Sequence, residues 1–476
     1  MRRVHSRARG KRFQSVDSNA PAATIENDTK KRESTSLSVA PVPTSVASHA
    51  SNKNQLTPAR SATQAPGEAV AKTTKATCTP SPTTNVPPSA TWTSCPYVGR
   101  DGKVNPDVRD LTGPAAINTM SQYALYGSIA FATKRTAKYS QDVVNAIDIF
   151  FLYPSTKMNP NVNYGQMVRG NGPEGKKGTF TGVLDIRGIV KVINAILILK
   201  SGGSAEWTNS KDEDMRSWVS DYTRWLEDSD IGAMASTRPN NHVTFYTGQL
   251  AASKLYVGDK QGAINVLQRF FKNEFRDQIA ASGEQPFEGI RAKPLHYRSF
   301  NLEALIMNAK LGDALGIDLW SAKSKYGATI QTALDYAITC DPNGEDVLDL
   351  VPHVAAVSAA YGDPTGRYKS FLSKTMSNYE SRPLWFYNQP SAFTKSATSG
   401  KSKRGVIFGR DDDASEEGGS NEQPTVQGGP VAGRPSIPFA CPEAFKDTAK
   451  VEIDNGIYVT CEQLRPFYET NVPQLE

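Results

Sequence analysis

The sequence predicts an all-α protein, an incomplete α/α toroid built of helical hairpins. Apolar residues recur at three- and four-residue spacing in about ten segments of the central chain, as in amphipathic helices. No run of alternating apolar and polar residues there is long enough to indicate a strand. No repeat of about 34 or 40 residues occurs, which argues against a regular solenoid. Helical hairpins that close into a ring, with a cleft across one end, fit these observations.

The expected helices follow one another between residues 114 and 378. Ser140 precedes the second helix, and Gly316 and Gly362 lie where C-terminal glycines are preferred. The expected ranges are 114–134, 140–152, 184–200, 211–227, 242–257, 260–276, 300–316, 325–339, 347–361 and 365–378. The connections of unusual polarity, which are candidates for lining the cleft, are residues 157–181, 236–241 and 279–299.

Composition divides the chain into four parts. Residues 1–94 are rich in Ser, Thr, Ala and Pro and hold almost no aromatic side chains, so they cannot bury enough apolar surface to offset their chain entropy. We expect them to be a disordered tail, and residues 391–437 to be a low-complexity linker for the same reason. Residues 95–390 then form the helical domain, and residues 438–476 form a small C-terminal segment whose role the sequence does not indicate.

Charge and apolar runs restrict the partners of the protein. The formal net charge is +6, yet the basic excess lies in the N-terminal tail and the remainder is close to neutral. The basic start MRRVHSRARGKR would suit nucleic acid, but no nucleic-acid-reading module follows it. No run of about 18 apolar residues occurs, so no membrane span is expected. We expect a monomer that has neither nucleic acid nor a membrane as its partner.

The five cysteines favour an oxidising environment. Cys78 with Cys95, and Cys441 with Cys461, could form the disulfides of a secreted protein and leave Cys340 single. The cysteines show no CxxC spacing and no nearby histidine, so we expect no metal and no cofactor. The basic N-terminus has no apolar stretch of the kind found in secretory signals. We expect an extracellular protein, exported by a route that the sequence does not show.

The stretch RPNNHVTFY, residues 238–246, groups hydrogen-bonding and proton-carrying side chains in an apolar region. Asn241 can donate and accept hydrogen bonds, and His242 titrates near neutral pH. Tyr246 comes four residues after His242 and would share its face of a helix, where it could orient His242 or bind a sugar. The alternative is a helix N-terminus with an asparagine cap, in which His242 and Tyr246 are half-buried packing residues.

Residues 157–181 form a polar segment with side chains suited to gripping hydroxyl and carboxylate groups. These side chains are Asn163, Tyr164, Gln166 and Arg169. The alternative is an ordered loop that satisfies only its own backbone. Shortly afterwards Arg187 either pairs with Asp185 or lines the cleft.

The segment 279–299 ends in IRAKPLHYRS and concentrates cations around a tyrosine. Arg291, His296 and Arg298 lie within six residues of Tyr297. Nearby positive charge lowers the pKa of a tyrosine, so Tyr297 could act as an acid or a base. The alternative is that Tyr297 packs while Arg298 is solvated.

These clusters resemble a known family. The pattern NNHxxxY, followed downstream by RxxxLHYxxFxLEAL, resembles the alginate lyase family of polysaccharide lyases, whose members are α/α toroids. The blocks MNPNVNYGQMVRG, GTFTGVLDIRG and GEQPFE look like a fungal-type branch of that family. The similarity runs from about Asn105 to about Leu372 and leaves both tails uncovered.

The resemblance implies four catalytic residues. The family's Asn-His pair matches Asn241 and His242, its tyrosine matches Tyr297, and its arginine matches Arg291. The interval from Arg291 to Tyr297 is one residue shorter than in bacterial members, which weakens the assignment of Arg291. The remaining polar residues are candidates for binding the substrate: Asn163, Tyr164, Gln166, Arg169, Arg187, Tyr246, His296 and Arg298.

The expected chemistry is metal-independent β-elimination on an acidic, uronate-containing polysaccharide of the alginate or glucuronan type. The proton on C5 becomes acidic when the adjacent carboxylate is neutralised, for which Asn241 and Arg291 are candidates. A base removes that proton and an acid protonates the departing O4, which leaves a 4,5-unsaturated uronate end. His242 and Tyr297 could fill these roles in either order.

Two other functions remain open at this point. A glycoside hydrolase on a similar toroid would need two carboxylates that flank the bond, and Glu284, Glu288 and Glu303 are available. A non-catalytic carbohydrate-binding protein could retain the same fold. An unsaturated product would exclude both alternatives.

Overall fold

The computed structural model describes residues 101–103, 108, 112–166, 177–388 and 437–470. The chain divides after Thr73, and every described residue belongs to the unit formed by residues 74–476. The predicted N-terminal tail and nearly all of the predicted linker therefore lie outside the described residues, as do Cys78 and Cys95. Among the residues that are described, no helix combines the length and apolarity needed to cross a membrane.

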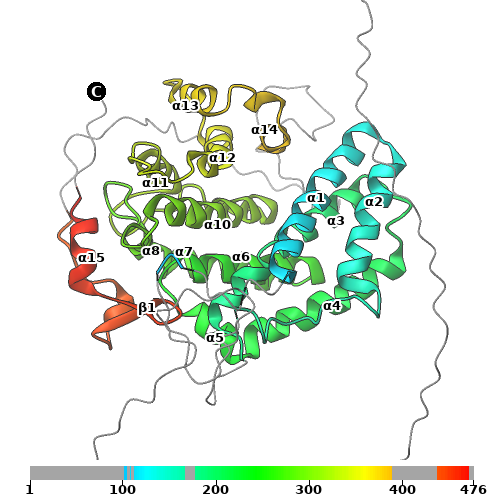
Figure 1. The fold of residues 1–476 in the computed structure, drawn as a ribbon, viewed down its shortest axis with the longest axis horizontal. Coiled ribbons are helices and arrows are strands. Elements are labelled where there is room, and N and C mark those ends of the chain that lie inside the picture. Colours follow the sequence, from blue (N-terminus) through cyan, green and yellow to red (C-terminus); the bar gives the residue numbers. More distant parts are fainter. Residues whose placement is uncertain (1–100, 104–107, 109–111, 167–176, 389–436, 471–476) are drawn as a thin grey trace, which may run out of the picture. The chain divides into compact units, whose positions relative to one another are not determined.

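Helices make up most of the described chain (Figure 1), and the prediction of an all-α fold is confirmed. The ten expected segments are helical, although some are divided in two. They are α1 (Gly113–Lys134), α2 (Ala137–Ile147) with η2 (Asp148–Leu152), η3 (Phe180–Ile186) with α3 (Ile189–Ser201), α4 (Asn209–Asp228), α6 (Asn241–Val257), α7 (Lys260–Lys272) with α8 (Phe275–Gln278), α10 (Pro294–Leu315), α11 (Ile330–Ala337), η4 (Val347–Leu350) with α12 (Val351–Tyr361), and α13 (Arg367–Thr375). The short elements that the periodicity missed are α5 (Asp230–Ser236), α9 (Pro286–Gly289), η5 (Tyr379–Ser381), α14 (Pro383–Asn388), η6 (Glu443–Phe445) and α15 (Cys461–Tyr468).

The helices pack as an inner and an outer set. α1 packs on α3, α3 on α6, α6 on α10, and α10 on α12, which places these five helices in succession around the interior. Helices α2, α4, α7, α11 and α13 pack against this inner set from outside. This alternation of inner and outer helices is that of the expected incomplete α/α toroid.

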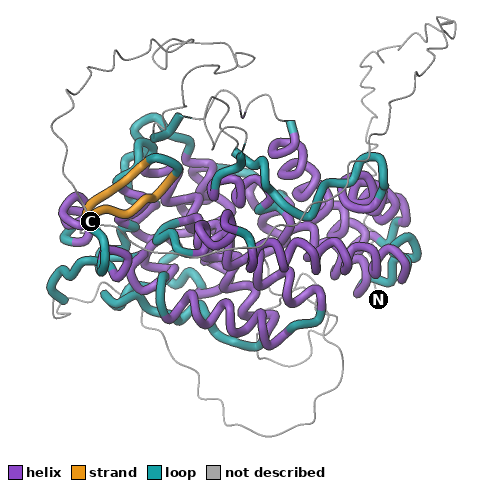
Figure 2. Tube along the Cα trace, turned by 90° about the horizontal axis from the view of Figure 1, so that it is seen from below, coloured by secondary structure: helices purple, strands orange, loops and turns teal. Residues whose placement is uncertain are grey.

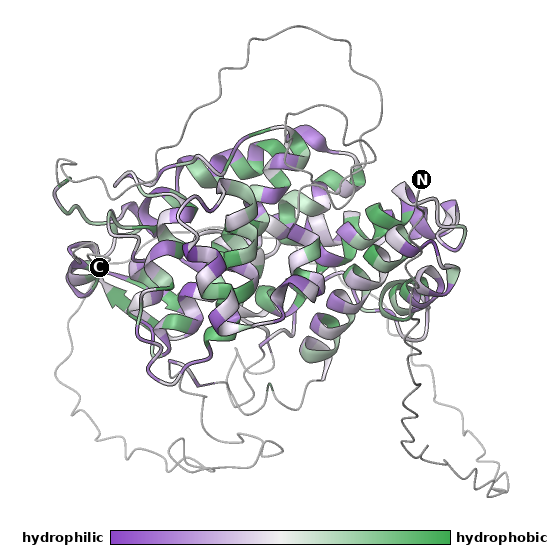
Figure 3. Ribbon diagram, turned by 90° about the horizontal axis from the view of Figure 1, so that it is seen from above, coloured by the Kyte–Doolittle hydropathy of each residue, from purple (hydrophilic) through white to green (hydrophobic). Residues whose placement is uncertain are grey.

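Apolar side chains fill the space between the two sets. Ile193 on α3, Leu302 on α10 and Val354 on α12 are fully buried, and each such burial contributes about 1.5–3 kcal/mol. Figure 3 shows single helices that carry both hydrophobic and hydrophilic residues, as an amphipathic helix must. Helix α6 differs because it is buried on nearly every side, its polar residues Asn241 and His242 included. Buried polar groups of this kind need partners, and their partners define the site described below.

Helix α10 begins six residues earlier than the sequence analysis expected. Helix α10 starts at Pro294 instead of at residue 300, because proline is favoured in the first turn of a helix. His296, Tyr297 and Arg298 therefore lie on the first turns of a rigid helix and not in a loop.

A two-stranded antiparallel sheet lies in the C-terminal segment and was not predicted (Figure 2). Strand β1 (Lys450–Asp454) pairs with β2 (Ile457–Thr460). The apolar side chains of this hairpin join Phe445, Leu464 and Tyr468 of the same segment in a small cluster against Phe287 of α9. The C-terminal segment is thus docked on the helical domain through a core of its own.

The disulfide prediction is confirmed where the structure can test it. Cys441 and Cys461 are bonded, which ties the start of the C-terminal segment to the start of α15. Cys340 is a free thiol, as expected.

Candidate active site

Three consecutive polar residues lie at the start of helix α6, and two of them, Asn240 and His242, face the C-terminal hairpin. Asn240 occupies the N-cap position, yet its side chain does not cap the helix. Its Nδ2 donates instead to the carbonyl oxygen of Ile453 at 2.8 Å, and its Oδ1 lies 3.1 Å from Nδ1 of His242. Asn240 therefore occupies the N-cap position of the alternative interpretation, but its side chain links the hairpin to His242 and does not cap the helix.

These contacts fix the tautomer of His242. Since Nδ2 of Asn240 is committed as a donor to Ile453, its Oδ1 must accept, and Nδ1 of His242 must carry the hydrogen. The lone pair is then on Nε2. Burial lowers the pKa of His242 to about 4, with Arg291 and Arg238 adding to the decrease and Asp454 opposing it. His242 is consequently neutral at neutral pH, with Nε2 able to accept a proton.

Asn241 is held by a buried carboxyl group. Its backbone N–H donates to Oε1 of Glu288 at 2.7 Å, and its Nδ2 donates to Oε1 and Oε2 at 3.1 and 2.9 Å. Burial raises the pKa of Glu288 to about 7, against the lowering effects of Arg291 and of these hydrogen bonds. Glu288 therefore titrates near neutral pH, and its protonation state governs which end of the Asn241 amide faces away from it.

Arg291 and Tyr297 meet at the start of helix α10. The guanidinium carbon of Arg291 lies 3.7 Å from the centre of the Tyr297 ring, which is a close cation–π contact. Arg291 lowers the pKa of Tyr297, but burial has the larger effect and raises it to about 12. The sequence argument that cations would depress this pKa is therefore outweighed, and Tyr297 is protonated at neutral pH.

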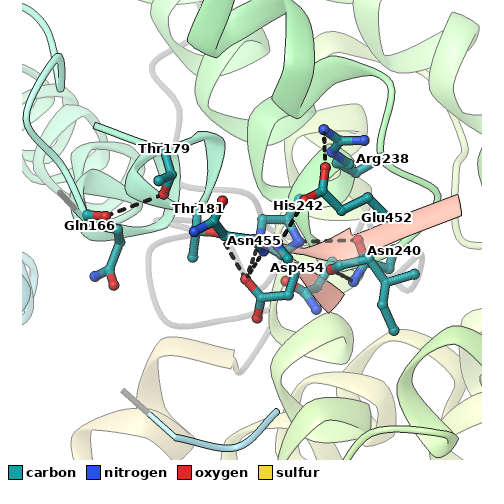
Figure 4. A network of polar contacts seen from close by, with 12 residues as sticks. Gln166, Thr179, Thr181, Arg238, Asn240, His242, Glu452, Asp454 and Asn455 are labelled. Carbon is teal, nitrogen blue, oxygen red and sulfur yellow. Dashed lines mark hydrogen bonds and ion pairs between the residues drawn. The ribbon is translucent and has the colours of Figure 1, made fainter. Parts of the chain in front are cut away.

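The C-terminal hairpin contributes a carboxylate to the same cluster (Figure 4). Asp454 lies at the end of β1, with Oδ1 3.8 Å from Nε2 of His242. Its Oδ2 lies 2.6 Å from Nη2 of Arg291. Thr181 donates to Oδ1 at 2.8 Å. Burial alone would raise the pKa of Asp454, but His242, Arg291 and Thr181 together hold it below its usual value.

A second carboxylate fixes the other side of Arg291. Its Nε donates to Oδ1 of Asp101 at 2.8 Å, and the side chain has no exposed surface. Its remaining nitrogen, Nη1, is buried without a hydrogen-bond partner among the described residues, and so are Nε2 of His242 and Oδ1 of Asn241. Each of these three side chains therefore carries one polar atom that is buried and has no hydrogen-bond partner among the described residues.

A cavity of about 620 Å³ lies between α1, α3, α10, α12 and α14, and Asn241, His242, Arg291 and Tyr297 are not among its lining residues. His296 lines it, and the ring of His296 lies 5.4 Å from that of Tyr297. Arg187 also lines it, with its guanidinium carbon 5.0 Å from the centre of the Phe300 ring. Lys191 faces the same cavity and pairs with Glu303 at 3.1 Å.

The predicted polar loop is only partly placed. Asn163 accepts from the indole of Trp225 at 2.7 Å, and Gln166 donates to Asp185 at 2.6 Å. Asp185 thus meets Gln166, whereas Nη1 of Arg187 donates to the carbonyl of Leu184 at 3.0 Å and its side chain lines the cavity, as the second alternative expected. Tyr164 is 66% exposed, so its ring is accessible to a ligand, while Arg169 lies outside the described residues.

Two predicted substrate-binding residues do not reach the site. Tyr246 is buried, and its hydroxyl donates to the carbonyl of Leu226 at 3.1 Å, so it neither orients His242 nor contacts the cavity. Arg298 forms a two-point ion pair with Glu284, at 2.7 and 2.6 Å. Its helical position turns it away from Tyr297, into the protein interior, and its role is structural.

The carboxylates that a hydrolase would need are all engaged. Glu284 pairs with Arg298, Glu288 holds Asn241, and Glu303 pairs with Lys191. Within the described residues, no group of three or more His, Cys, Asp or Glu side chains is placed to hold a metal ion. The cluster is therefore rich in amide, imidazole, phenol and guanidinium groups, which suits proton transfer next to a carboxylate.

Comparison with known proteins decides the family. A family model described as alginate lyase matches residues 44–345, which is more than half of the chain. This chain belongs to the alginate lyase family. The match begins earlier and ends earlier than the resemblance between Asn105 and Leu372, and it does not bear on a fungal-type branch. A polysaccharide lyase is thus established as the class of enzyme, in preference to a hydrolase or a binding protein.

A solved structure of an alginate lyase shares the fold. An alginate lyase from Bacteroides ovatus is 25% identical, with a TM-score of 0.53, and the match covers 63% of this chain and 79% of that one. Alginate lyase A1-III in complex with a tetrasaccharide is 16% identical with a TM-score of 0.41, over 60% and 80% of the two chains. The comparison with curated proteins gave no match.

Proposed function

We propose that this alginate lyase family member cleaves a uronate-containing acidic polysaccharide, of the alginate or glucuronan type, by metal-independent β-elimination. The supporting observation is the meeting of Asn241, His242, Arg291 and Tyr297, which come from two helix starts more than 50 residues apart in sequence. Each supplies a group that the reaction requires. Asn241, His242 and Arg291 each carry a buried polar atom without a partner among the described residues, and Tyr297 lies against Arg291.

Arg291 and Asn241 neutralise the uronate carboxylate in this proposal. Asp101 and Asp454 hold Nε and Nη2 of Arg291, so that Nη1 is the nitrogen left for the substrate. Asn241 becomes a donor to the substrate when Glu288 is protonated, because Glu288 can then donate to Oδ1 of Asn241 and leave its Nδ2 free. Preorganised donors of this kind stabilise the enolate-like transition state.

His242 and Tyr297 divide the proton transfers. His242 is neutral with its lone pair on Nε2, so it takes the C5 proton. Tyr297 is protonated, so it gives its proton to O4 as the C4–O4 bond breaks. The electrons of the broken C5–H bond form the C4=C5 double bond, which leaves a 4,5-unsaturated uronate on one product and a free hydroxyl on the other.

The cavity beside Tyr297 holds the neighbouring sugars. Its volume of about 620 Å³ is typical of sites for elongated small ligands. Arg187, Lys191 and His296 bring donors to its wall, which suits a chain that carries a carboxylate on every sugar. The exposed ring of Tyr164 is a further contact for the polymer.

We also propose that the enzyme acts outside the cell as a monomer. The disulfide between Cys441 and Cys461 supports this location, because such bonds persist in oxidising compartments. The division into an N-terminal tail, a helical domain, a linker and a C-terminal segment is retained as part of the proposal.

The test is an assay on a panel of polymers. Alginate, glucuronan and chondroitin-type polymers are each incubated with the protein, and the ultraviolet absorbance of the unsaturated uronate is followed, with and without EDTA. We expect absorbance to rise with a uronate polymer, to persist in EDTA, and to be lost in His242→Ala. New reducing ends without absorbance would refute elimination, and loss of activity in EDTA would refute metal independence.

A further inference from the structure

The carboxylate of Asp454 lies where the proposed mechanism needs the carboxylate of the substrate. It accepts from Nη2 of Arg291 at 2.6 Å and from Thr181 at 2.8 Å, and it lies 3.8 Å from Nε2 of His242. A uronate undergoing elimination must bring its carboxylate to Arg291 and its C5 proton to His242. Asp454 therefore makes the contacts that a bound uronate would make, with the same functional group.

The rest of strand β1 is anchored on either side of this contact. Glu452 pairs with Arg238 at 2.9 Å, and the carbonyl of Ile453 accepts from Asn240 at 2.8 Å. Ile453 also packs in the apolar cluster with Phe287 and Phe445. Asp454 is thus delivered to the cluster by a docked strand, and its position follows from the fold of the C-terminal segment.

His242 and Arg291 have no open access to solvent in this arrangement. Nε2 of His242 and Nη1 of Arg291 are closed to solvent, although neither has a hydrogen-bond partner among the described residues. Proton abstraction requires C5 to approach Nε2 to about 3 Å. The Asp454 carboxylate, 3.8 Å from Nε2 of His242, therefore occupies space that a uronate bound this closely would need.

Charge leads to the same conclusion. Arg291 already faces two carboxylates, Asp101 and Asp454. A third carboxylate beside them would meet like charges at short range in a water-poor site, where repulsion is strong. Exchange of Asp454 for the substrate's carboxylate keeps the charge of the cluster unchanged, whereas addition does not.

We propose that Asp454 is an internal ligand of the uronate-carboxylate subsite, so that the C-terminal hairpin and the substrate compete for Arg291 and Thr181. The proposal rests on the function proposed above and adds Thr181 to its substrate-binding residues. Only the hairpin turn has to withdraw. Pairing between β1 and β2 is already irregular between Glu452 and Asp454, and Gly456 has a positive φ of 77°, so the turn can move while the disulfide and the apolar cluster hold the rest.

The first experiment compares Asp454→Asn with the unaltered protein. Asparagine keeps the shape and can still accept hydrogen bonds, but it removes the competing charge. If the carboxylate blocks the subsite in about nine molecules of ten, its release raises the apparent affinity about tenfold. Glu462→Gln is the matched control, because it makes the same change on an exposed residue of the same segment. Affinity is measured by calorimetry with saturated oligomannuronate and oligoglucuronate, and folding by thermal unfolding.

The outcomes are separable from those of the activity assay. Tighter binding in Asp454→Asn, unchanged binding in Glu462→Gln, and weaker binding when Thr181→Val is added to Asp454→Asn would support the internal ligand. Unchanged or weaker oligouronate binding in a folded Asp454→Asn would overturn it, whether or not elimination occurs. A fall in kcat at unchanged KM would also overturn it, because Asp454 would then assist His242 directly. Absence of unsaturated product from every variant and polymer would refute the proposed function instead.

Discussion

The same substitution, tyrosine to phenylalanine, should have opposite effects at two positions of this chain: loss of activity at one and loss of stability at the other. Tyr297→Phe and Tyr246→Phe each delete one hydroxyl from a largely buried ring. In Tyr297 no hydrogen bond joins the hydroxyl to another described residue, and Phe keeps the ring under Arg291, 3.7 Å from its guanidinium carbon. In Tyr246 the hydroxyl donates to the buried carbonyl of Leu226 at 3.1 Å.

The expected magnitudes follow from these contacts. Loss of a general acid lowers kcat by about 10²–10⁴-fold, or roughly 3–5 kcal/mol in the activation free energy. Tyr297→Phe should therefore be nearly inactive with an almost unchanged free energy of unfolding. Tyr246→Phe leaves a carbonyl unpaired, which costs about 1–3 kcal/mol of stability, and should retain its kcat at temperatures where it is folded.

The assay measures kcat from the ultraviolet absorbance of the product and stability from urea unfolding, on both variants side by side. A folded Tyr297→Phe with kcat close to that of the unaltered protein would refute the assignment of the acid. Loss of activity in a folded Tyr246→Phe would show that the tyrosine set aside here belongs to the site.

Three further outcomes are expected from the buried charges. In the unaltered protein kcat/KM should fall as pH rises through about 7, where Glu288 loses its proton, and Glu288→Gln, which cannot lose one, should show no such fall in its pH profile. Burial lowers the pKa of His353 to about 4 in the folded state. Between pH 6.5 and 4 this histidine is therefore protonated in the unfolded chain but not in the folded one. The free energy of unfolding should fall with acidification over that range, by at most about 3 kcal/mol. Urea unfolding across that pH window should show a smaller loss in His353→Gln. Arg298→Leu leaves Glu284 buried without its partner and should lower the stability measured by thermal unfolding by about 3–5 kcal/mol. Adding Glu284→Leu should restore part of that loss. Equal stability of Arg298→Leu and the unaltered protein would contradict the structural role of Arg298.

The sequence was sufficient for the helices because their formation depends on local periodicity. All ten expected segments are helical, and the apolar residues that defined them, such as Ile193 and Leu302, are buried. The short elements were not predicted because three to eight residues hold too few repeats of the pattern. The start of α10 was misplaced because the polar stretch RAKPLHYRS lacks the apolar periodicity that indicates a helix, although the helix begins within it.

The site was predicted in its residue types but not in its contacts. Asn241, His242, Arg291 and Tyr297 do come together, yet their partners Glu288 and Asp454 could not be assigned from spacing, since Asp454 lies more than 200 residues from His242. The hairpin itself left a trace in the sequence. The stretch VEIDNGIYV alternates apolar residues around Asn-Gly, which is a strong hairpin pattern, and Gly456 has the positive φ that this pattern requires.

In the proposed mechanism, anion recognition arises from the arrangement of the groups in the cluster and not from the net charge of the protein. Helix α6 begins at Asn241, whose backbone N–H meets Glu288, and helix α10 begins three residues after Arg291. Both helix starts carry partial positive charge, which favours a carboxylate. In the structure Glu288 pairs with the backbone N–H of Asn241, and Asp101 and Asp454 pair with Arg291. The net charge of the helical domain is near neutral because carboxylates of the same chain balance cations such as Arg291. Net charge therefore does not indicate the proposed anion site. A uronate polymer gains little binding free energy by adding its carboxylate to such a cluster, and more by replacing a carboxylate that is already there. The affinity for the polymer should therefore depend more on how easily Asp454 leaves than on the number of cations in the cleft.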